Sequence, residues 1–272
     1  MRAQTTAIPV LMYHHVNPQG SFINVRPETF ELHMRYLKKK GFTAIHTGEF
    51  SDILTGRAAA PRRPVMITFD DGWLDNWVFA FPVLRKYGMR AVIFLVTGHI
   101  AGQGRRHRSD EESVAALPPH REAKALVERG RTGEVMLSWD EAAEMKDSGL
   151  VEFHSHTHTH QRWDKLIPDR DGRNAALRGD LVAAKELLEK KGMKGDALCW
   201  PQGFYDDDYR GIAGSLGYRM MFTTEAGTNG PGAELSRIRR IVIGDISVFS
   251  LAKKLFIYSR PGLSRVYLRY FK

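Results

Sequence analysis

Two acidic residues, Asp70 and Asp71, stand side by side at the end of an apolar run, and they are the first candidates for chemistry. Residues 65–69 are typical of a buried strand, and Gly72 supplies the tight turn that ends it. In parallel α/β folds, active sites lie beyond the carboxyl ends of the strands. Two adjacent carboxylates there require a cation or a shared proton. The pair therefore indicates a functional site, because a solvated turn would explain only one acid and the glycine.

A second candidate is a stretch of four histidines at alternate positions, His154, His156, His158 and His160. In a continuous strand all four side chains would share one face, whereas a turn would bring together histidines four residues apart. Neutral imidazoles bind divalent transition metals, and a carboxylate would complete such a site. A single histidine would be interpreted as a packed or surface residue. Four in so short a stretch favour a metal site.

Together these motifs resemble the polysaccharide deacetylase family, also known as carbohydrate esterase family 4 or NodB-like proteins. The resemblance runs from about residue 9 to residue 225 and is strongest for the poly-N-acetylglucosamine deacetylase branch. It implies a single-domain α/β fold, a distorted (β/α) barrel with about seven parallel strands. It also implies a hydrolase that removes an N-acetyl, sometimes an O-acetyl, group from a sugar. The segments that carry the resemblance are residues 9–16, 68–72, 155–160 and 200–203.

The resemblance assigns roles to individual residues. Asp70 would be the general base, and Asp71 would bind the metal together with His156 and His160. The cation would lower the pKa of a bound water and polarise the acyl carbonyl, while Asp70 takes the proton. Zinc is the expected ion, with cobalt, nickel or manganese as alternatives.

The choice of histidines has a rival, because His154 and His158 have the same spacing as His156 and His160. Members of the family usually have a small residue where His154 stands. We therefore expect His154 and His158 to support the site rather than to bind the metal, and we keep them as the alternative pair of ligands.

Residues 200–203 match the family's third motif only in part. Pro201 would shape a turn, and the backbone N–H of Gln202 would face the oxyanion of the tetrahedral intermediate. Cys199 stands where many members have an arginine that orients the catalytic aspartate. We expect Cys199 itself to be a packing residue, because its neighbours are apolar.

The general acid is also not where many members have it. They supply a histidine near the C-terminus, but no histidine follows His160 in this chain. His14, at the end of the first predicted strand, is the best substitute. His15 is the alternative, although along a strand the two side chains point to opposite faces.

The remaining sequence predicts strands alternating with helices, which indicates one α/β domain with a parallel sheet. We expect a catalytic domain over residues 1–249, interrupted by a long polar excursion at 98–135. The basic run 105–108 within this excursion is typical of a solvated loop. The expected strands are 9–16, 43–46, 65–69, 89–97, the histidine stretch, 197–200, 219–223 and 239–243, and the expected helices are 27–40, 75–86, 139–148, 174–191 and 206–216.

Residues 250–272 form a basic amphipathic C-terminal tail, with no acid and with aromatic residues between the cations. Such a tail can lie on an anionic membrane surface. It can equally be a packed terminal helix with a solvated basic face. The sequence leaves both interpretations open.

Composition limits the partners and the compartment. The net charge of +9 is dispersed and lacks a nucleic-acid motif, so we expect no nucleic acid, and an anionic membrane would suit the charge. The family resemblance implies an acetylated glycan as the partner. One cysteine excludes an internal disulfide. No leader segment is recognisable and no run is long enough to span a bilayer, which predicts a cytoplasmic protein. If the tail binds a membrane, the protein would lie peripherally at its inner face.

Two other functions compete with deacetylation. A catalytically weak, glycan-binding pseudoenzyme of the same fold would explain the missing arginine and the missing C-terminal histidine. A glycosidase would use Asp70 and Asp71 as acid and base, but adjacent strand residues diverge, whereas such pairs flank one bond at ~5–9 Å. The deacetylase remains the leading hypothesis.

Overall fold

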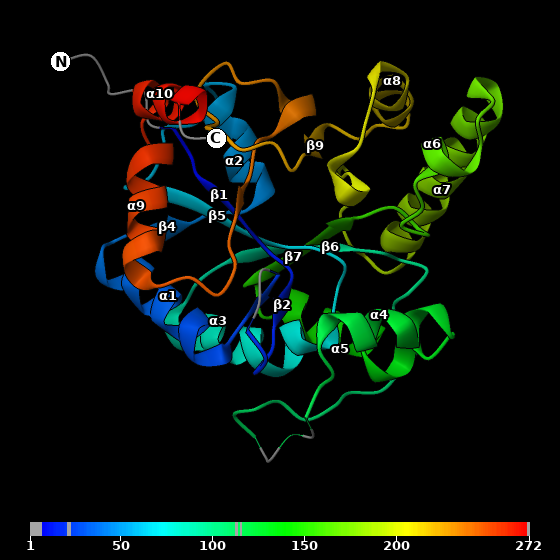
Figure 1. Cartoon of the computed structure of the whole chain (residues 1–272), viewed down its shortest axis with the longest axis horizontal. Helices are drawn as coiled ribbons and strands as arrows, with labels where there is room; N and C mark the ends of the chain where they lie inside the picture. The colour runs from blue at the N-terminus through cyan, green and yellow to red at the C-terminus, as the bar shows by residue number, and fades with distance from the viewer. Residues whose placement is uncertain (1–6, 21–22, 112–113, 115, 271–272) are drawn as a thin grey trace.

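A curled parallel sheet forms the centre of the computed structural model, which describes residues 7–20, 23–111, 114 and 116–270. Seven strands follow one another in the order β10-β1-β5-β6-β7-β8-β9, and β4 pairs with β5 beside this row (Figure 1). All of these pairings are parallel. The strands are β1 (Val10–Tyr13), β4 (Thr43–Ala44), β5 (Pro64–Phe69), β6 (Ala91–Leu95), β7 (Val151–Ser155), β8 (Ala197–Cys199), β9 (Met220–Phe222) and β10 (Ile241–Val242).

The two edges of the row are joined by the segment that leads into β10. Ile238 bridges to Phe222 of β9, and three residues later Ile241 pairs with Leu11 of β1. Residues 238–242 therefore close the sheet into a distorted barrel, which confirms the expected fold class. The described chain also has a short parallel pair of strands, β2 (His15–Val16) and β3 (Asn24–Val25), beside the barrel.

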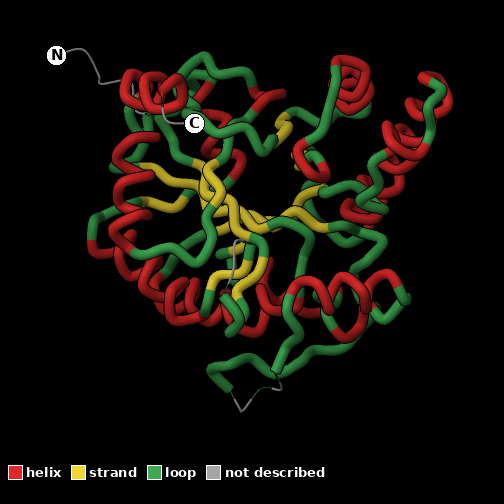
Figure 2. The backbone as a smooth tube through the Cα atoms, viewed as in Figure 1, coloured by secondary structure: helices red, strands yellow, loops and turns green. Residues whose placement is uncertain are grey.

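Helices surround the sheet on the outside, as the tube in Figure 2 shows. The helices expected from the sequence are found within a few residues of their predicted bounds, and α2 covers the stretch 47–55, for which the sequence predicts a helical turn region. Helices α9 and α10 lie in the C-terminal tail, and α4 and α6 are additional. The helical elements are α1 (Pro27–Lys39), α2 (Thr47–Leu54), η1 (Asn76–Ala80), α3 (Phe81–Tyr87), α4 (His120–Glu128), η2 (Thr132–Glu134), α5 (Trp139–Asp147), α6 (Trp163–Leu166), α7 (Arg170–Lys190), η3 (Pro201–Gly203), α8 (Asp207–Ser215), η4 (Leu235–Arg237), α9 (Val248–Tyr258) and α10 (Pro261–Tyr270).

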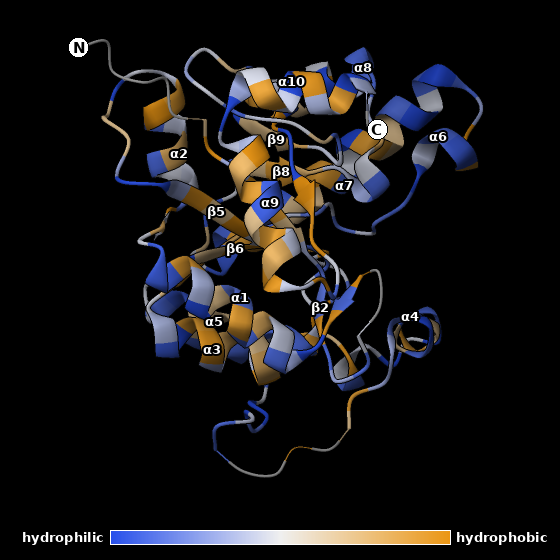
Figure 3. Cartoon of the chain, turned by 60° about the vertical axis from the view of Figure 1, so that its left-hand side comes forward, coloured by the Kyte–Doolittle hydropathy of each residue, from blue (hydrophilic) through white to orange (hydrophobic). Residues whose placement is uncertain are grey.

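The central strands are continuous apolar runs in the sequence because they are buried on both faces of the sheet. Every residue of β5 and β6 is buried, as expected for parallel strands covered on both faces. Figure 3 shows these strands as hydrophobic ribbon inside helices whose outer faces are hydrophilic. A carboxylate that follows β5 directly is therefore held by a rigid, dry scaffold.

The polar excursion at 98–135 is anchored to the barrel. The Arg106 guanidinium binds the buried carboxylate of Glu141 at 2.7 Å and the backbone oxygen of Met136 at 2.7 Å. Arg108 is itself buried and pairs with Glu144. The expectation of a solvated basic loop is therefore wrong for these two arginines, because nearby acids of α5 compensate their charge.

The C-terminal helices pack on the barrel rather than extending from it. Helix α9 buries Leu251, Leu255 and Tyr258, and it lies against α1. No helix among the described residues combines the length and the apolar character that a transmembrane segment requires.

Candidate metal and catalytic centre

The turn after β5 sends its two carboxylates in different directions. Asp70 continues the strand, and its N–H donates to the backbone oxygen of Tyr13 at 3.1 Å. Asp71 has a positive φ of 76°, followed by Gly72 at 84°. A Cβ at Gly72 would lie 2.6 Å from Leu95 Cδ2, so the turn needs a glycine for space as well as for backbone conformation. Asp70 is consequently buried, while Asp71 faces a cavity.

The histidine stretch turns rather than continuing as a strand. Strand β7 ends at Ser155, and positive φ values at Thr157 (67°) and His160 (58°) reverse the chain. The backbone N–H groups of His158 and Thr159 donate to Asp180 Oδ1 at 3.0 and 2.8 Å, which holds the turn. Asp180 comes from α7 and was not identified from the sequence.

This turn brings His156 and His160 to Asp71. The Nε2 atoms of His156 and His160 lie 3.4 and 3.5 Å from Asp71 Oδ1. Donors bound at ~2.0–2.1 Å to one tetrahedral ion are separated by roughly 3.3–3.4 Å, so the spacing suits a zinc-sized cation. The residues present therefore fit a divalent metal, with Asp71, His156 and His160 as its protein ligands.

Two features prepare these imidazoles for a metal. The Nδ1–H of His156 donates to the backbone oxygen of Cys199 at 2.8 Å, which leaves the Nε2 atom directed toward Asp71. Burial lowers the pKa of His160 to about 4, against the opposing effect of Asp71, so this ring is neutral at neutral pH. Burial would raise the pKa of Asp71, but the neighbouring imidazoles hold it well below its usual range.

The alternative pair of histidines points elsewhere. His154 is fully buried, and its Nε2 lies 3.1 Å from Thr47 Oγ1. His158 Nδ1 lies 2.9 Å from Thr97 Oγ1. Neither belongs to a metal-sized cluster of donors within the described part of the chain. Their contacts are structural.

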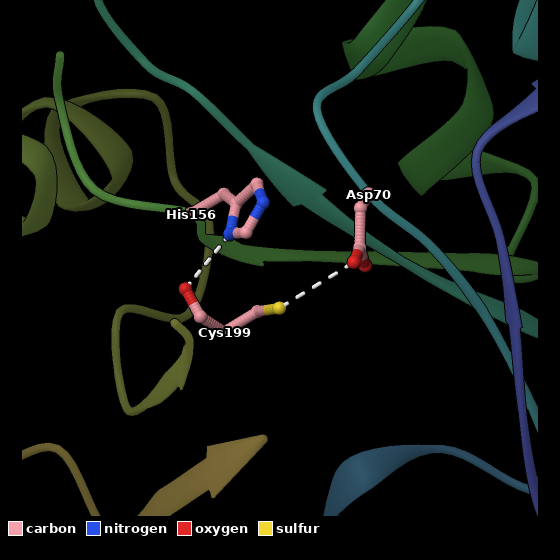
Figure 4. A group of neighbouring side chains, drawn as sticks. All are labelled: Asp70, His156 and Cys199. Carbon is pink, nitrogen blue, oxygen red and sulfur yellow. Dashed lines mark hydrogen bonds between the residues drawn. The ribbon is translucent and has the colours of Figure 1, made fainter. Parts of the chain in front are cut away.

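A second cluster of donors, Asp70, His156 and Cys199, lies beside the first (Figure 4). The Cys199 thiol is 3.6 Å from Asp70 Oδ2, and burial raises its pKa, so it remains protonated. His156 uses Nδ1 to bind the Cys199 carbonyl, and the Asp70 carboxylate is already bound to a guanidinium. This cluster is therefore poorly suited to a metal and instead packs behind the first one.

That guanidinium belongs to Arg240, a residue that sequence reasoning missed. Its Nη1 and Nη2 donate to the two carboxylate oxygens of Asp70 at 2.6 and 2.8 Å, and Nη2 lies 3.0 Å from Cys199 Sγ. The side chain is fully buried. Burial would raise the pKa of Asp70, but Arg240 reverses this effect and lowers it below the ordinary value.

Arg240 places a cation beside Asp70, the group that many family members supply from the position of Cys199. It lies in the segment that closes the barrel, directly before β10. The available signal was a charged residue inside the predicted strand 239–243, whose side chain would have to face either the barrel interior or a helix. Nothing in the spacing connected it to Asp70, because the two are separated by 170 residues.

The two neighbouring histidines after β1 point to different surroundings. His14 lines the cavity, and its Nε2 is 3.8 Å from Asp70 Oδ2. Burial lowers the pKa of His14, while the carboxylates of Asp70 and Asp71 oppose this shift. His15 is buried on the other side, where it binds Asp75 at 2.6 Å.

The third motif forms a tight turn, η3, at the cavity wall. Gln202 has a positive φ of 54° and lines the cavity, while Pro201 is buried beneath it. Gly203 also has a positive φ, and a Cβ there would collide with the side chain of Thr224. Gln202 therefore shares the cavity of the metal-sized cluster, whereas Pro201 does not line it.

The candidate base, the metal-ligand candidates, His14 and Gln202 share one cavity of about 720 Å³. The base candidate, the three metal-ligand candidates and His14 line one part of it, and α4 and α6 contribute the outer walls. Its size is sufficient for a small ligand or a few sugar rings. The wall residues from α4 and α6 are His120, Lys124, Val127, Glu128, Lys165 and Leu166.

Comparison with known proteins gives a consistent result. The family described as polysaccharide deacetylase matches residues 57–221. YxkH of Bacillus subtilis, a protein with a polysaccharide deacetylase name, is 28% identical over 221 residues. The poly-beta-1,6-N-acetyl-D-glucosamine N-deacetylase of Staphylococcus aureus strain MRSA252 is 26% identical over 236 residues.

The matched regions cover most of this chain but less of those relatives. They represent 81% of this chain and 65% of YxkH, and 85% of this chain and 71% of the staphylococcal enzyme. Among solved structures, IcaB from Ammonifex degensii has a TM-score of 0.73 at 26% identity, covering 94% of this chain and 99% of that one. The family resemblance and the barrel fold inferred from the motifs are thereby confirmed.

Proposed function

Because this chain belongs to the polysaccharide deacetylase family, we propose that it is a metal-dependent hydrolase that removes the N-acetyl group from an acetamido sugar of a polysaccharide, oligosaccharide or lipid-linked glycan. One observation carries the proposal. A metal-sized cluster, Asp71 with His156 and His160, opens into the same cavity as the carboxylate of Asp70. Such a set suits hydrolysis of an amide, because it combines a cation site with a fixed base.

The residues would hold one divalent ion, with zinc as the first choice and cobalt, nickel or manganese as alternatives. Bound there, the ion lowers the pKa of water and polarises the acyl oxygen. His156 and His160 would hold it through Nε2, and Asp71 would hold it through Oδ1. The indole N–H of Trp73 donates to the other Asp71 oxygen, Oδ2, at 2.8 Å and so fixes the orientation of this carboxylate.

Asp70 would act as the general base. Its low pKa keeps it ionised at neutral pH, and the two bonds from Arg240 fix its orientation. The carboxylate has four lone pairs, and Arg240 and the Cys199 thiol engage three of them, so one remains to accept the proton of the attacking water. Arg240 is thus a positioning residue. It also answers one of the two arguments for a glycan-binding pseudoenzyme, the missing arginine, since a cation beside the base is present.

His14 would act as the general acid. Its Nε2 lies on the cavity side of Asp70, so a proton held there can reach the leaving amine nitrogen as the amide C–N bond breaks. Burial disfavours the protonated ring, and the two adjacent carboxylates favour it. The backbone N–H of Gln202, together with the turn at Pro201, would face the developing oxyanion.

The direct test is acetate release from a panel of N-acetylated oligosaccharides and lipid-linked sugars, with metal removed and then restored. We expect release that is lost with the metal and returns with it. His14→Ala should lower kcat more than it changes KM. Binding of glycan and metal without any acetate release would favour the pseudoenzyme, and activity that resists chelation would overturn the metal-dependent proposal.

We further propose that α9 and α10 contact an anionic membrane. Of the seven large apolar side chains that are exposed in the described chain, five lie on these helices. Residues 248–270 contain no acid, and cations alternate with the exposed apolar groups, which is the pattern of an interfacial helix. The exposed side chains are Phe249, Phe256, Leu263, Val266 and Tyr270, and the cations are Lys253, Lys254, Arg260, Arg265 and Arg269.

This surface lies at the opposite end of the barrel from the cavity. A groove beside α9 and α10 is lined by Pro64, the first residue of β5, whereas Asp70 follows the last residue of that strand. Membrane contact would therefore direct the catalytic cavity away from the bilayer. That orientation suits a glycan that extends from the surface better than one whose acetamido sugar lies at the headgroups.

Sedimentation with vesicles tests this contact. We expect binding to vesicles that contain phosphatidylglycerol and little binding to pure phosphatidylcholine. Arg265→Glu combined with Arg269→Glu should abolish it, whereas Leu32→Ser, at an exposed apolar residue of α1, should not. Equal binding to both vesicles, or concentration-dependent dimerisation through Phe249 and Val266 without vesicle binding, would overturn the proposal.

A further inference from the structure

Three hydrogen-bonded side chains, Asp75, His15 and His120, form a row that begins in the protein interior and ends at the cavity. Asp75 Oδ2 lies 2.6 Å from His15 Nδ1, and His15 Nε2 lies 3.0 Å from His120 Nδ1. Asp75 and His15 are 3% and 1% exposed, whereas His120 is half-buried and lines the cavity. None of the three is a metal-ligand candidate or the candidate base, so the row has no role in the mechanism described above.

The contacts of Asp75 determine where the protons lie. Its other oxygen, Oδ1, accepts from the backbone N–H of Val16 at 3.2 Å and from the Asn76 amide at 3.0 Å. Asp75 therefore accepts in each of these hydrogen bonds, and the proton in its short bond to His15 is on His15 Nδ1. In the neutral ring, His15 Nε2 is then an acceptor too. It must accept the Nδ1–H of His120.

The consequence appears at the cavity. With its proton on Nδ1, the neutral His120 ring has a lone pair on Nε2, at the edge of the ring opposite His15. Nε2 has no hydrogen-bond partner within the described part of the chain. The ring cannot rotate freely, because its Nδ1 bond and an edge-on contact with Trp73 at 5.7 Å hold it.

Trp73 links this row to the metal-ligand candidates. Its ring stacks on His15 with centroids 4.4 Å apart, while its N–H donates to Asp71. His120 therefore occupies a fixed position relative to Asp71. A group on the substrate that reaches His120 is placed at a defined distance from the reacting acetamide.

We propose that His120 Nε2 accepts a hydrogen bond from a hydroxyl of the glycan, and that Asp75 and His15 position it by fixing the proton on Nδ1. The inference rests on the proposed deacetylase function and adds a specificity-determining contact to it. A sugar hydroxyl is a donor that matches this lone pair. A ring with that hydroxyl blocked by an O-acyl group or a glycosidic bond would lose the contact.

A structural role is the alternative, since His120 also ties α4 to the barrel. The experiment therefore compares two substrates, an oligomer of β-1,6-linked N-acetylglucosamine and 4-nitrophenyl acetate, which has no hydroxyl. The readout is the ratio of the two kcat/KM values in the full-length protein. A fold defect would lower both values, whereas loss of a glycan contact lowers the ratio.

We expect His120→Phe to lower this ratio about 10-fold, mainly through KM for the oligomer, which corresponds to one hydrogen bond. His120→Gln, whose amide oxygen can replace Nε2, should recover part of the ratio. Arg121→Gln, at an exposed residue of the same helix, serves as control. Equal losses on both substrates with His120→Phe, or no loss, would overturn the proposal.

Positioning by Asp75 is tested through non-additivity. Asp75 does not line the cavity, yet Asp75→Asn should lower the ratio of kcat/KM for the oligomer to kcat/KM for the ester. It should have no further effect on this ratio in a protein that already carries His120→Phe. Additive effects would show that Asp75 acts independently of His120 and would overturn the positioning role.

NMR of the ring nitrogens of His120 shows which nitrogen carries the proton. It tests the role of His120 independently of whether the protein is a deacetylase. We expect Nδ1 protonated and Nε2 unprotonated, with the Nε2 signal shifting when the oligomer is added to Asp70→Asn protein. A proton on Nε2 overturns the inference whatever the activity. A wild-type protein that hydrolyses the ester but releases no acetate from any glycan overturns the proposed function instead.

Discussion

Asp70 and Asp71 are adjacent in the chain but lie in two different regions of the molecule. Asp70 is 2% exposed, bound on both oxygens by Arg240 and backed by Cys199. Asp71 lies on the cavity side, among the imidazoles of His156 and His160. Both carboxylates line the cavity, but the first is more deeply buried and is paired with a cation of the protein, whereas the second belongs to a candidate cation site.

This difference explains how two neighbouring carboxylates can have different functions. The cation beside Asp70 is part of the protein, so that carboxylate remains ionised without binding a metal. The neighbours of Asp71 are imidazoles, which bind metals in their neutral form, so that carboxylate would be left to bind an exogenous ion. The predictions that follow test this division, beginning with the largest expected effect.

His156→Ala should remove one of the three metal ligands and with it both metal and turnover. We expect the metal content after gel filtration to fall far below one equivalent and kcat/KM to fall about 10³-fold or more, since the cation contributes several kcal/mol to the barrier. Elemental analysis and acetate release measure the two effects. A variant that retained full metal would show that His156 is not a ligand.

Asp70→Asn should separate the two regions. We expect kcat to fall about 10²- to 10⁴-fold while the metal content stays unchanged, because the general base is lost and the ligands are not. The Asp70→Asn, Arg240→Gln double variant is the control for the buried guanidinium that would otherwise lack its partner. Loss of metal together with activity in both variants would contradict the division.

Arg240→Gln should change the pKa of the base Asp70, although Arg240 itself does not line the cavity. Burial is then unopposed and the pKa of Asp70 rises, so the acidic limb of the kcat/KM profile moves to higher pH, because the base must be ionised. Breaking this buried pair should also lower the free energy of unfolding by about 3–5 kcal/mol. Arg239→Gln is the matched control, and an unmoved pH profile would assign Arg240 to stability alone.

His158→Gln should have the smallest effect. This histidine belongs to the same stretch as the ligand candidates but contacts Thr97, so we expect unchanged metal content and a stability loss of about 1 kcal/mol. Thermal unfolding and elemental analysis measure the two quantities. Loss of metal here would restore the alternative ligand pair, His154 and His158.

Local patterns predicted the parts of the site that depend on local structure. The strand before Asp70, the turn at Gly72 and the alternation of strands and helices are consequences of apolar runs and glycines, which act over a few residues. The choice of His156 and His160 needed one further fact, the turn at Thr157, because a continuous strand would have presented all four histidines together.

The parts that could not be predicted depend on contacts between distant segments. Arg240 reaches Asp70 only because residues 238–242 join β9 to β1, and a barrel closure has no local sequence signal. Asp180 is similar, since its role depends on how α7 packs beside the histidine turn. Helix α4 was missed because charged and proline residues around it dominate the composition of the excursion.

The closure of the barrel also has a consequence for the order of events during synthesis. Arg240 is among the last barrel residues to be made, and its contact with Asp70 spans 170 positions of the chain. Contacts of such long sequence separation form late and at a high cost in chain entropy. A nascent chain that already contains every metal-ligand candidate would therefore still lack an oriented base, so catalytic competence would arise only when the last strand is in place.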